Sequence, residues 1–432
     1  MARSRLRLIT NRFGRDVDLI PHKTSAVGLA KKCIRGGLNL LDGIASVRPQ
    51  PQGAVSWTEV DVSGWGEGDS SSISSREAES VRWIHGSPMR DIGICRVRMA
   101  EVCFFKPRPD ESVNPLDRRA VVRVSPFRRV AYPGAPYLFS AWARNLRHGR
   151  KTVSRRCGRL RERVALLGNA GSDSCNYYHF WIDTVGDLLM LRDALPVDLQ
   201  PDRFLVSYGA QPWQEQILEM VGIESRQLVR YADHERLRCD ELLIPVRDKG
   251  ALNITAGLVD RIRRSVSLPA LDREPYRCLY ISRGDSVRRP VRNEAAVQAL
   301  VQRHGLEVKE LSGITVIEQI GLFAAARLVV ATHGAGLTNL MWCQEGTVVI
   351  ELLPDLHRIP CFREICRQRK LEHRVIVCPQ SGSENTALGA MEVPLHHLEE
   401  ALKENGHSAM PSRVAACSLP ARYAGTAGRT TE

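Results

Sequence analysis

The chain has 432 residues, 43% of them apolar, and a formal charge of +13 that comes mostly from arginine. This length and composition are typical of a globular protein with two or three domains, and no stretch reaches the roughly 18 apolar residues of a membrane-spanning helix. The charge suits anionic substrates, an anionic membrane face or no specific partner. Nucleic acid is not expected, because no helix-turn-helix, zinc-finger or aromatic RNA-binding motif accompanies the charge.

The 12 cysteines are scattered singly, and even the closest pair, Cys361 and Cys366, has four residues between its members. Free thiols in a reducing compartment fit this pattern better than a disulfide framework or a zinc site. The N-terminal residues 1–15 are basic and have no apolar core behind them, so no cleaved signal peptide is expected. We therefore expect a cytoplasmic protein, and its charge is compatible with a peripheral contact at the inner face of the plasma membrane.

The first part of the chain is predicted to hold little regular structure. Residues 1–90 are interpreted as a basic extension that is partly flexible, with a glycine- and serine-rich loop at Gly64–Ser75. Two stretches rich in β-branched and aromatic residues, Ile94–Phe105 and Ala120–Val124, predict short strands. Residues 91–160 are therefore predicted to form a small β-rich lead-in.

From Val164 onward, predicted strands and helices alternate, which indicates a parallel sheet covered by helices. The predicted strands are 164–168, 204–206 and 241–244, and the predicted helices are 177–194, 213–221 and 253–266. This pattern predicts a first α/β unit at 161–268, followed by a proline-bearing hinge at 269–275.

The alternation resumes after the hinge and predicts a second α/β unit at 276–404. Its predicted strands are 277–281, 307–311, 328–331, 347–352 and 374–377, and its predicted helices are 294–304, 316–326, 337–343 and 395–404. The tail at 405–432 is rich in small and polar residues and is predicted to be disordered.

A glycine turn at 333–336 is the most informative part of the second unit. It follows the apolar strand Leu328–Ala331 and precedes a helix start whose free N–H groups face the turn, and the next strand carries Glu351. Such a turn lets a ligand approach closely, and this order of elements places a diphosphate on the helix N-terminus and a carboxylate on a ribose. A dinucleotide and a sugar nucleotide both fit, although Asn339 stands where the dinucleotide fingerprint has its third glycine. A plain strand-to-helix turn is the third interpretation.

Three motifs in order resemble glycosyltransferase family 61. They are HGAGLTNLMW with IELLP at 333–342 and 350–354, the N-Y-Y-H-W-like segment Asn176–Asp183, and the Y-x-S-R segment Tyr280–Arg283 that continues to Asn293-Glu294, with a further match at Glu318–Ile320. The resemblance spans about 168–354. It is closest to the bacterial capsular polysaccharide type, which is related to eukaryotic O-linked N-acetylglucosaminyl transferases and xylan xylosyl or arabinosyl transferases.

The resemblance implies a GT-B-like α/β fold with two Rossmann-like domains that face a cleft. In this arrangement 161–268 is the acceptor domain and 276–404 is the nucleotide-sugar domain. The resemblance also implies inversion of configuration, and hence a single displacement without a covalent intermediate.

A glycosyl transfer needs a base for the acceptor hydroxyl and positive charge for the departing diphosphate. His179 and Asp183 are the candidates for the base, because residues four apart point to one face of a helix. Two alternatives stay open: His179 orients the helix, and Asp183 pairs with an arginine.

Arg283 is the main candidate for holding the diphosphate, because it follows a strand at the end where ligands bind in open α/β sheets. Arg289 matches the second arginine of the family, and Arg288 stands beside it. A guanidinium grips phosphate oxygens without a metal. Asn293 is a weaker candidate that also fits a helix N-cap.

The remaining donor-binding candidates surround the glycine turn and the strand after it. They are His333, Gly334, Ala335, Gly336, Leu337, Thr338, Asn339 and Glu351, the last on the ribose hydroxyls. The only Asp-x-Asp triplet, Asp16-Val17-Asp18, lies in the basic N-terminal segment rather than after a strand, so neither an essential metal nor a cofactor is expected.

The favoured hypothesis is an inverting, metal-independent hexosyl- or pentosyltransferase. It would use a nucleoside-diphosphate sugar, with UDP as the nucleotide, and a glycan or lipid-linked acceptor in capsular polysaccharide or exopolysaccharide synthesis. One alternative is a non-catalytic nucleotide-sugar-binding or scaffold protein of a polysaccharide assembly complex. A less favoured alternative is an NAD-dependent oxidoreductase in which Glu351 contacts the adenosine ribose.

Overall fold

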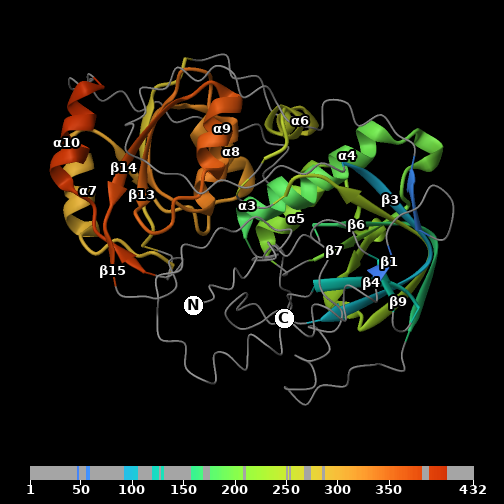
Figure 1. Ribbon diagram of the computed structural model, residues 1–432. Coiled ribbons are helices and arrows are strands. Elements are labelled where there is room, and N and C mark those ends of the chain that lie inside the picture. The colour runs from blue at the N-terminus through green and yellow to red at the C-terminus, as the bar shows by residue number, and fades with distance from the viewer. Residues whose placement is uncertain are drawn as a thin grey trace, which may run out of the picture.

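The computed structural model describes residues 46–47, 55–58, 92–105, 119–125, 128–130, 157–168, 176–207, 211–249, 252, 254–266, 274–284, 288–381 and 389–405. They form a nine-stranded mixed sheet, a five-stranded parallel sheet and a two-stranded ribbon, with helices packed against the sheets (Figure 1). The predicted α/β class is confirmed. In this part of the chain, no helix combines the length and the apolar content that crossing a membrane requires.

The nine-stranded sheet unites the predicted lead-in with the first α/β unit. Its order is β1 (Ser46–Val47), β5 (Arg128–Val130), β4 (Arg119–Ser125), β3 (Gly93–Phe105), β9 (Arg236–Val246), β6 (Gly158–Leu167), β7 (Arg203–Val206) and β8 (Leu228–Arg230), with β2 (Val55–Thr58) also paired to β3. Strand β9 pairs antiparallel with β3 on one edge and parallel with β6 on the other. The described strands of 91–160 and of 161–268 therefore share one sheet, and the predicted boundary between the two ranges does not separate two sheets.

The predicted helix 177–194 is present and continuous, but its middle turn is π-helical. It consists of α3 (Tyr177–His179), the π-helix η1 (Phe180–Val185) and α4 (Gly186–Ala194). Asn176 caps its start, because the Asn176 carboxamide oxygen accepts from the backbone N–H groups of Tyr178 and His179. The other helices of this unit are α5 (Pro212–Met220), α6 (Leu258–Ser265) and the short 3-10 turns η2 (Val197–Leu199), η3 (Ser225–Gln227) and η4 (Tyr231–Asp233).

The second sheet is entirely parallel, as predicted. Its order is β11 (Glu307–Lys309), β10 (Arg277–Ile281), β12 (Ala326–Thr332), β13 (Val348–Pro354) and β14 (Glu372–Cys378). In chain order this is 2-1-3-4-5, so the direction in which strands are added reverses between β10 and β12. Open α/β sheets bind ligands at such a switch point, outside the carboxyl ends of the strands.

Five helical segments connect these strands and continue beyond them. They are α7 (Glu294–Arg303), α8 (Val316–Ala324), the 3-10 helix η5 (Ala335–Trp342), α9 (Cys361–Arg369) and α10 (Leu395–Glu404), and the ribbon β15 (Gln380–Ser381) with β16 (Ala390–Met391) precedes α10. Thr315 and Glu318 start α8 with a capping box. Helix α9 was not among the predicted helices, and η5 is a 3-10 helix where an ordinary helix was predicted.

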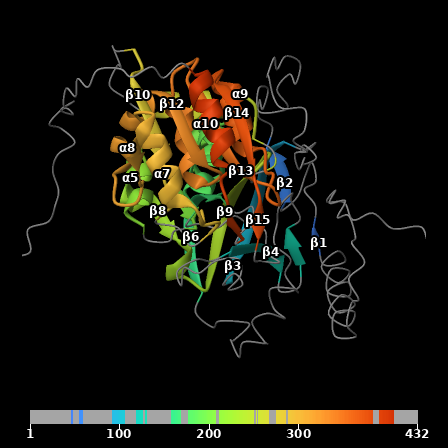
Figure 2. The same ribbon diagram turned by 90° about the vertical axis from the view of Figure 1, so that its left-hand side faces the viewer.

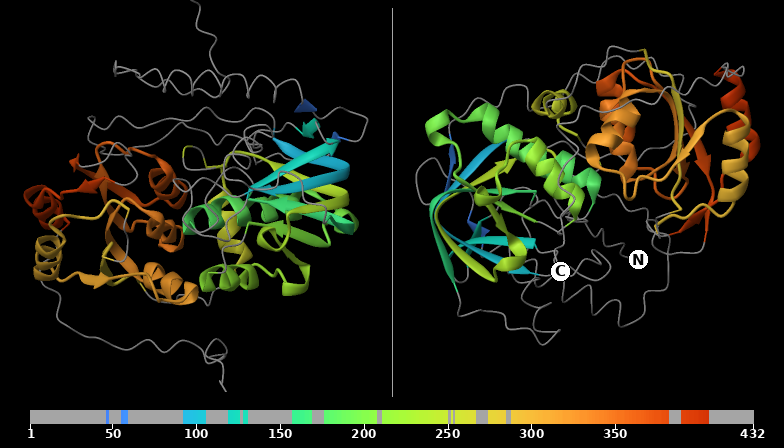
Figure 3. Two further views of the ribbon diagram at one scale, coloured as in Figure 1. Left: turned by 90° about the horizontal axis from the view of Figure 1, so that it is seen from below. Right: turned by 180° about the vertical axis from the view of Figure 1, so that it is seen from behind.

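The two faces of the second sheet are covered differently. Helices α7 and α10 cover the face that points away from the first unit, and both lie in front in Figure 2. Helices α8 and α9 cover the opposite face, which is the side of the first unit (Figure 3). Helix α8 contacts α5, and helix α9 contacts α6. The second sheet therefore has helices on both sides, and one of these helical layers also faces the first unit.

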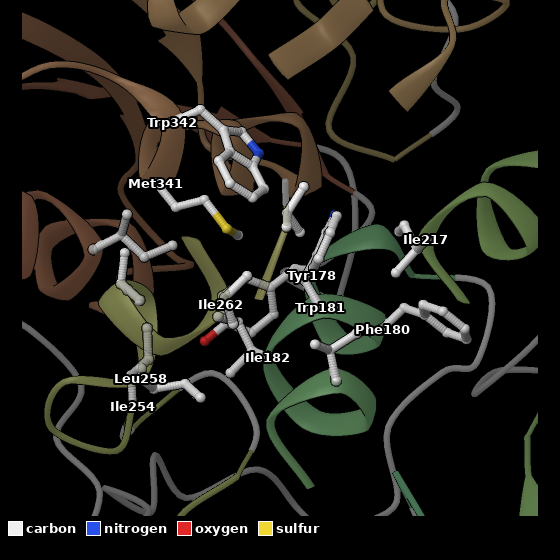
Figure 4. Packing of buried hydrophobic residues seen from close by; sticks show 14 of the residues in the cluster. Tyr178, Phe180, Trp181, Ile182, Ile217, Ile254, Leu258, Ile262, Met341 and Trp342 are labelled. Atoms are coloured by element: carbon white, nitrogen blue, oxygen red, sulfur yellow. The ribbon is translucent and has the colours of Figure 1, made fainter. Parts of the chain in front are cut away.

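One apolar core runs through the contact between the two units (Figure 4). Trp181 from η1 and Trp342 from η5 pack with their ring centroids 5.5 Å apart. Leu258 and Ile262 of α6 and Met341 of η5 belong to the same cluster of buried residues. A GT-B cleft stays a prediction, since what the described residues place between the units is this core.

Several predicted segments lie outside the described residues. They are the N-terminal extension apart from β1 and β2, with Asp16-Val17-Asp18 in it, residues 269–273 of the predicted hinge, and the tail after 405.

Candidate functional site

The switch point brings together two of the predicted motifs. Ser282 and Arg283 follow β10, and His333 and Gly334 follow β12, the adjacent strand. The backbone N–H of His333 donates to the carbonyl of Leu352 at 3.0 Å, which extends the sheet by one residue into the turn. Arg283 and His333 are therefore neighbours in space although 50 residues separate them.

Arg283 lies directly against the glycine turn. Its Nη1 donates to the His333 carbonyl at 3.4 Å, and its Nη2 donates to the Arg288 carbonyl at 2.7 Å. A Cβ placed on Gly334 would lie 1.6 Å from Nη1 of Arg283. Gly334 has an extended backbone with φ 178°, so the position excludes a side chain because of the arginine and not because of its backbone angles.

Arg289 donates to the same carbonyl oxygen as Arg283. Its Nη2 donates to the His333 oxygen at 3.3 Å, and its own backbone adopts the left-handed region with φ 52°. Burial and the nearby charges of Arg283 and Arg288 lower the pKa of Arg289 to about 10. The structure thus gathers three guanidinium-bearing residues at the turn, where an anionic ligand would relieve their mutual repulsion.

Behind the turn, Glu351 holds two histidines. Its carboxylate lies 2.5 Å from Nδ1 of His333 and 2.8 Å from Nε2 of His373, and its side chain is fully buried. Burial alone would raise the pKa of Glu351, but hydrogen bonds from both histidines lower it to about 2. Burial also lowers the pKa of His333. Glu351 is therefore a carboxylate at neutral pH, and His333 is neutral with its proton assigned to Nδ1, which leaves Nε2 as a hydrogen-bond acceptor.

This arrangement changes what the two residues can do. Both carboxylate oxygens of Glu351 already accept hydrogen bonds from histidines, so Glu351 is placed to orient His333. A contact between Glu351 and a ribose stays a prediction. Neutral His333 accepts at Nε2, so it suits a ligand hydroxyl better than a phosphate oxygen. His357 packs against His333 with ring centroids 5.4 Å apart, and burial together with Arg289 lowers the pKa of His357 to about 3.

The residues after the glycine turn point largely into the core. Leu337, Thr338 and Asn339 are buried, whereas Ala335 and Gly336 are half-buried. The Asn339 carboxamide accepts from the Tyr177 hydroxyl at 3.0 Å and donates to the Gln319 side chain at 2.9 Å. Asn339 thus joins η5 to α3 and α8, and direct donor contacts from the Thr338 and Asn339 side chains stay predictions.

The Asn293-Glu294 motif supports the end of β10. Asn293 occupies the N-cap position of α7, as its place before the helix predicts, but its side chain makes no capping hydrogen bond. Its carboxamide instead donates to the Val393 carbonyl at 2.8 Å and accepts from the Val393 N–H at 3.0 Å. Glu294 accepts from the hydroxyls of Tyr280 at 2.8 Å and Ser282 at 2.6 Å.

His179 and Asp183 form a pair, as their spacing predicted. Nδ1 of His179 lies 2.8 Å from Oδ2 of Asp183. Asp183 is fully buried, whereas 20% of the His179 side chain is exposed. A buried carboxylate on Nδ1 fixes an imidazole so that Nε2 can accept a proton from a reactant.

An aromatic contact between the two units separates the two histidine–carboxylate pairs. His179 contacts Tyr178 with ring centroids 5.2 Å apart, Tyr178 contacts Phe362 at 5.8 Å, and Phe362 contacts His333 at 4.9 Å. Phe362 belongs to α9, which the sequence analysis missed. The spacing of its buried residues Cys361, Phe362, Ile365 and Cys366 was the signal that could have revealed this helix.

Possible metal ligands gather elsewhere in the described part of the chain. His396, His397 and Glu400 lie together on α10, and all three are exposed. They are not part of the switch-point site, and the prediction of a metal-independent protein stays a prediction.

One family model matches the part of the chain that holds this site. Residues 177–350 match the family model described as Glycosyltransferase 61. The Beta-1,2-xylosyltransferase RCN11 of Oryza sativa subsp. japonica is 36% identical over 64 residues, a stretch that covers 15% of this chain and 12% of that relative. The family match extends from the start of α3 into β13, so it includes His179, Asp183, Arg283 and His333.

Proposed function

We propose that the protein is an inverting, metal-independent glycosyltransferase that uses a nucleoside-diphosphate sugar. This proposal starts from the match of residues 177–350 to glycosyltransferase family 61. The observation that carries this proposal is the convergence of Arg283 and Arg289 on the His333-Gly334 turn at the switch point of a parallel sheet. UDP is the nucleotide that the family resemblance favours.

On the donor side, the arginines neutralise the charge that develops on the departing diphosphate. Guanidinium groups hold phosphate oxygens in a planar, two-pronged geometry and stay charged even when partly buried. His333 accepts a hydrogen bond from a sugar or ribose hydroxyl through Nε2, and Glu351 keeps it in that orientation.

On the acceptor side, His179 is the base and Asp183 orients it. The acceptor oxygen forms a bond to the anomeric carbon while the bond from that carbon to the phosphate oxygen breaks. The hydroxyl proton moves to Nε2 of His179, and the bonding electrons leave with the nucleoside diphosphate. Attack opposite to the leaving group inverts the configuration of the sugar, and no covalent intermediate with the protein forms.

The acceptor in this proposal is a glycan or a lipid-linked sugar of cell-surface polysaccharide synthesis. The charge of +13 is compatible with a cytoplasmic protein that meets such a lipid at an anionic membrane surface. In a GT-B-like arrangement, the unit that carries His179 binds the acceptor and the unit that carries Arg283 binds the donor. The printed name of the rice relative makes a pentose such as xylose a candidate sugar beside the hexoses.

Donor binding tests the proposal directly. Isothermal calorimetry with EDTA present would compare UDP-glucose, UDP-N-acetylglucosamine, UDP-xylose, GDP-mannose and NAD. We expect one UDP-sugar to bind, and Arg283→Ala to weaken its binding at least tenfold. Arg159→Ala is the matched control, because Arg159 is an exposed arginine on the first sheet that pairs with Asp240.

Transfer activity separates an enzyme from a binding protein. His179→Ala is expected to keep donor binding and to reduce transfer at least a hundredfold, in line with the usual contribution of a general base. Binding of NAD alone, or a donor affinity that Arg283→Ala leaves unchanged, would contradict the proposed site. Donor binding by a wild-type protein that transfers no sugar to any acceptor tested would favour the non-catalytic alternative.

A further inference from the structure

We infer that Arg247 is a positioning residue for the His179–Asp183 pair: its buried guanidinium fixes the π-helical turn from which Asp183 reaches His179. The role of this pair in sugar transfer rests on the proposed function, but the positioning itself is a property of the structure. Arg247 is fully buried and follows the end of β9, distant in sequence from both members of the pair.

The first observation is where the guanidinium donates. Its Nη2 lies 2.6 Å from the carbonyl oxygen of Ile182 and 2.8 Å from that of Asp183. Both carbonyls belong to the π-helix η1, a rare geometry that is widened by one residue per hydrogen-bonded turn and is frequent at functional sites. Arg247 therefore grips the backbone of the residue whose carboxylate orients His179.

The second observation is how firmly the guanidinium itself is held. Its Nε lies 3.0 Å from Oδ1 of Asp187, and both side chains are fully buried. Its Nη1 donates to the Asp248 carbonyl at 2.8 Å. Oδ2 of Asp187 accepts in turn from Nζ of Lys249 at 2.6 Å and from the backbone N–H of Gly168 at 2.9 Å. Each nitrogen of the guanidinium thus has a fixed neighbour, either on the segment after β9 or on the helix.

The third observation is that the helix leaves room for this arginine. A Cβ on Gly186 would lie 2.2 Å from Nη2 of Arg247 and 2.7 Å from its Cζ. Gly186 has ordinary helical angles, φ −58° and ψ −37°, so its backbone does not require glycine. Since glycine inside a helix is unfavourable, the space that the guanidinium occupies is the physical reason for glycine at this position.

These contacts link the first sheet to the candidate base. A shift of the Ile182 and Asp183 carbonyls would turn the Asp183 side chain, and the 2.8 Å contact with Nδ1 of His179 would lengthen. His179 would then lose the group that keeps its proton on Nδ1, and Nε2 would be protonated in part of the molecules. Arg283 and the His333-Gly334 turn belong to the other sheet, so their contacts would not change.

Two variants test this role. Arg247→Lys keeps a positive charge for Asp187 but gathers its donors on one terminal nitrogen, whereas Arg247 reaches the two carbonyls with Nη2 and Asp187 with Nε. Gly186→Ala leaves Arg247 in the sequence and pushes its guanidinium away from the helix. Arg261→Lys is the matched control, because Arg261 on α6 pairs with the half-exposed Asp193 and donates to the Ala256 carbonyl, which does not belong to η1.

The first measurement does not require activity. Nitrogen NMR of histidine-labelled full-length protein reports the tautomer and titration of each imidazole, and loss of a signal in His179→Gln assigns His179. We expect Arg247→Lys and Gly186→Ala to change the tautomer population of His179 and to leave His333 unchanged. In the transfer assay we expect kcat to fall at least tenfold with an altered pH profile, and KM for the UDP-sugar to stay within twofold.

The outcomes separate this inference from the proposed function. A folded Arg247→Lys protein with wild-type His179 signals and wild-type kcat would overturn the positioning role. Equal losses in kcat and in donor affinity would also overturn it, because they would indicate a general structural role. If the wild-type protein transfers no sugar but the variants still change His179, the positioning role stands and the proposed reaction is wrong. If Arg247→Lys does not fold, the His179 signals and the kcat of Gly186→Ala decide whether Arg247 has the positioning role.

Discussion

Gly334 shows how a single missing side chain shapes the candidate donor site. An alanine Cβ would come within 1.6 Å of Nη1 of Arg283, which is far closer than two atoms can approach. Since an alanine can adopt the backbone angles of Gly334, we expect Gly334→Ala to fold and to displace Arg283 from the turn. Arg283 would then lose its proposed charged hydrogen bonds to the diphosphate, which contribute about 1.5–3 kcal/mol to binding. We therefore expect calorimetry to show a tenfold or larger loss of UDP-sugar affinity.

Gly321→Ala is the matched control for this substitution. Gly321 lies inside α8, and a Cβ there would meet nothing within 4 Å. We expect unchanged donor affinity and a stability gain of about 0.5–1 kcal/mol, the usual effect of replacing a helical glycine by alanine. Equal affinities in the two variants would show that Arg283 does not need its position against Gly334.

The titration of His357 predicts how stability depends on pH. The folded protein lowers the pKa of His357 from 6.5 to about 3, through burial first and then the charge of Arg289. Below pH 6.5 the unfolded chain therefore binds a proton that the folded protein does not bind. This contribution to stability is complete above pH 6.5 and is lost progressively as the pH falls toward 3. His333, whose pKa is also lowered, acts in the same direction.

Urea unfolding at several pH values between 7 and 4 would measure this effect. We expect His357→Gln to reduce the slope of the free energy of unfolding against pH by up to about 1.4 kcal/mol per pH unit, which is the slope that one bound proton contributes. His396→Gln, at an exposed position on α10, is the matched substitution with which the slope of His357→Gln is compared. A wild-type slope in His357→Gln would show that His357 titrates alike in the folded and unfolded protein.

At the scale of elements, the contact between α3 and η5 depends on a buried hydrogen bond. The Tyr177 hydroxyl donates to the side-chain oxygen of Asn339, which is fully buried. Tyr177→Phe removes the donor and keeps the ring against Trp213, so the loss should be that of an unsatisfied buried acceptor, about 1–3 kcal/mol. Tyr276→Phe is the control, because Tyr276 is 51% exposed. A difference of less than about 0.5 kcal/mol between the two variants in urea unfolding would contradict this role for the interface.

The elements themselves were largely predictable from the sequence, and their contacts were not. Strand β10 and helix α10 begin and end where the sequence patterns place them, because their apolar periodicity is regular and their flanks carry turn residues. Helix α9 was missed because two cysteines supply half of its buried positions, and the π-helical turn was missed because nothing in local propensity marks it. Its stabilising partner, Arg247, lies 64 residues from Asp183.

The candidate site was predictable where a motif sits at the end of a strand. The sequence pattern places Arg283 and His333 each after a strand of one parallel sheet, and they meet because β10 and β12 are adjacent in the structure. The hydrogen bonds from His333 and His373 to Glu351 were not predictable, because no motif marks His373 as a residue that faces the same carboxylate. The burial of Asn339 depends likewise on α3, which comes from the other unit.

At the scale of the whole molecule, the shared core makes the two units thermodynamically dependent on each other. The cluster that contains Trp181 also contains Trp342, Leu243 of the first sheet and Val329 of the second. Separating the units would expose these side chains to water at a cost of about 25 cal/mol per Å² of apolar surface. We therefore expect the described parts of both sheets to unfold in one cooperative transition.

Calorimetry and hydrogen exchange would test this dependence together. Trp342→Ala removes a buried ring at the contact and should lower stability by about 3–5 kcal/mol. In a cooperative molecule the amides of β6 and β13 lose protection to the same extent, and a bound UDP-sugar raises the protection of both, although only β13 belongs to the donor-binding sheet. Two calorimetric transitions in the wild-type protein, with only one of them moved by the donor, would instead show independent domains that meet across an open cleft.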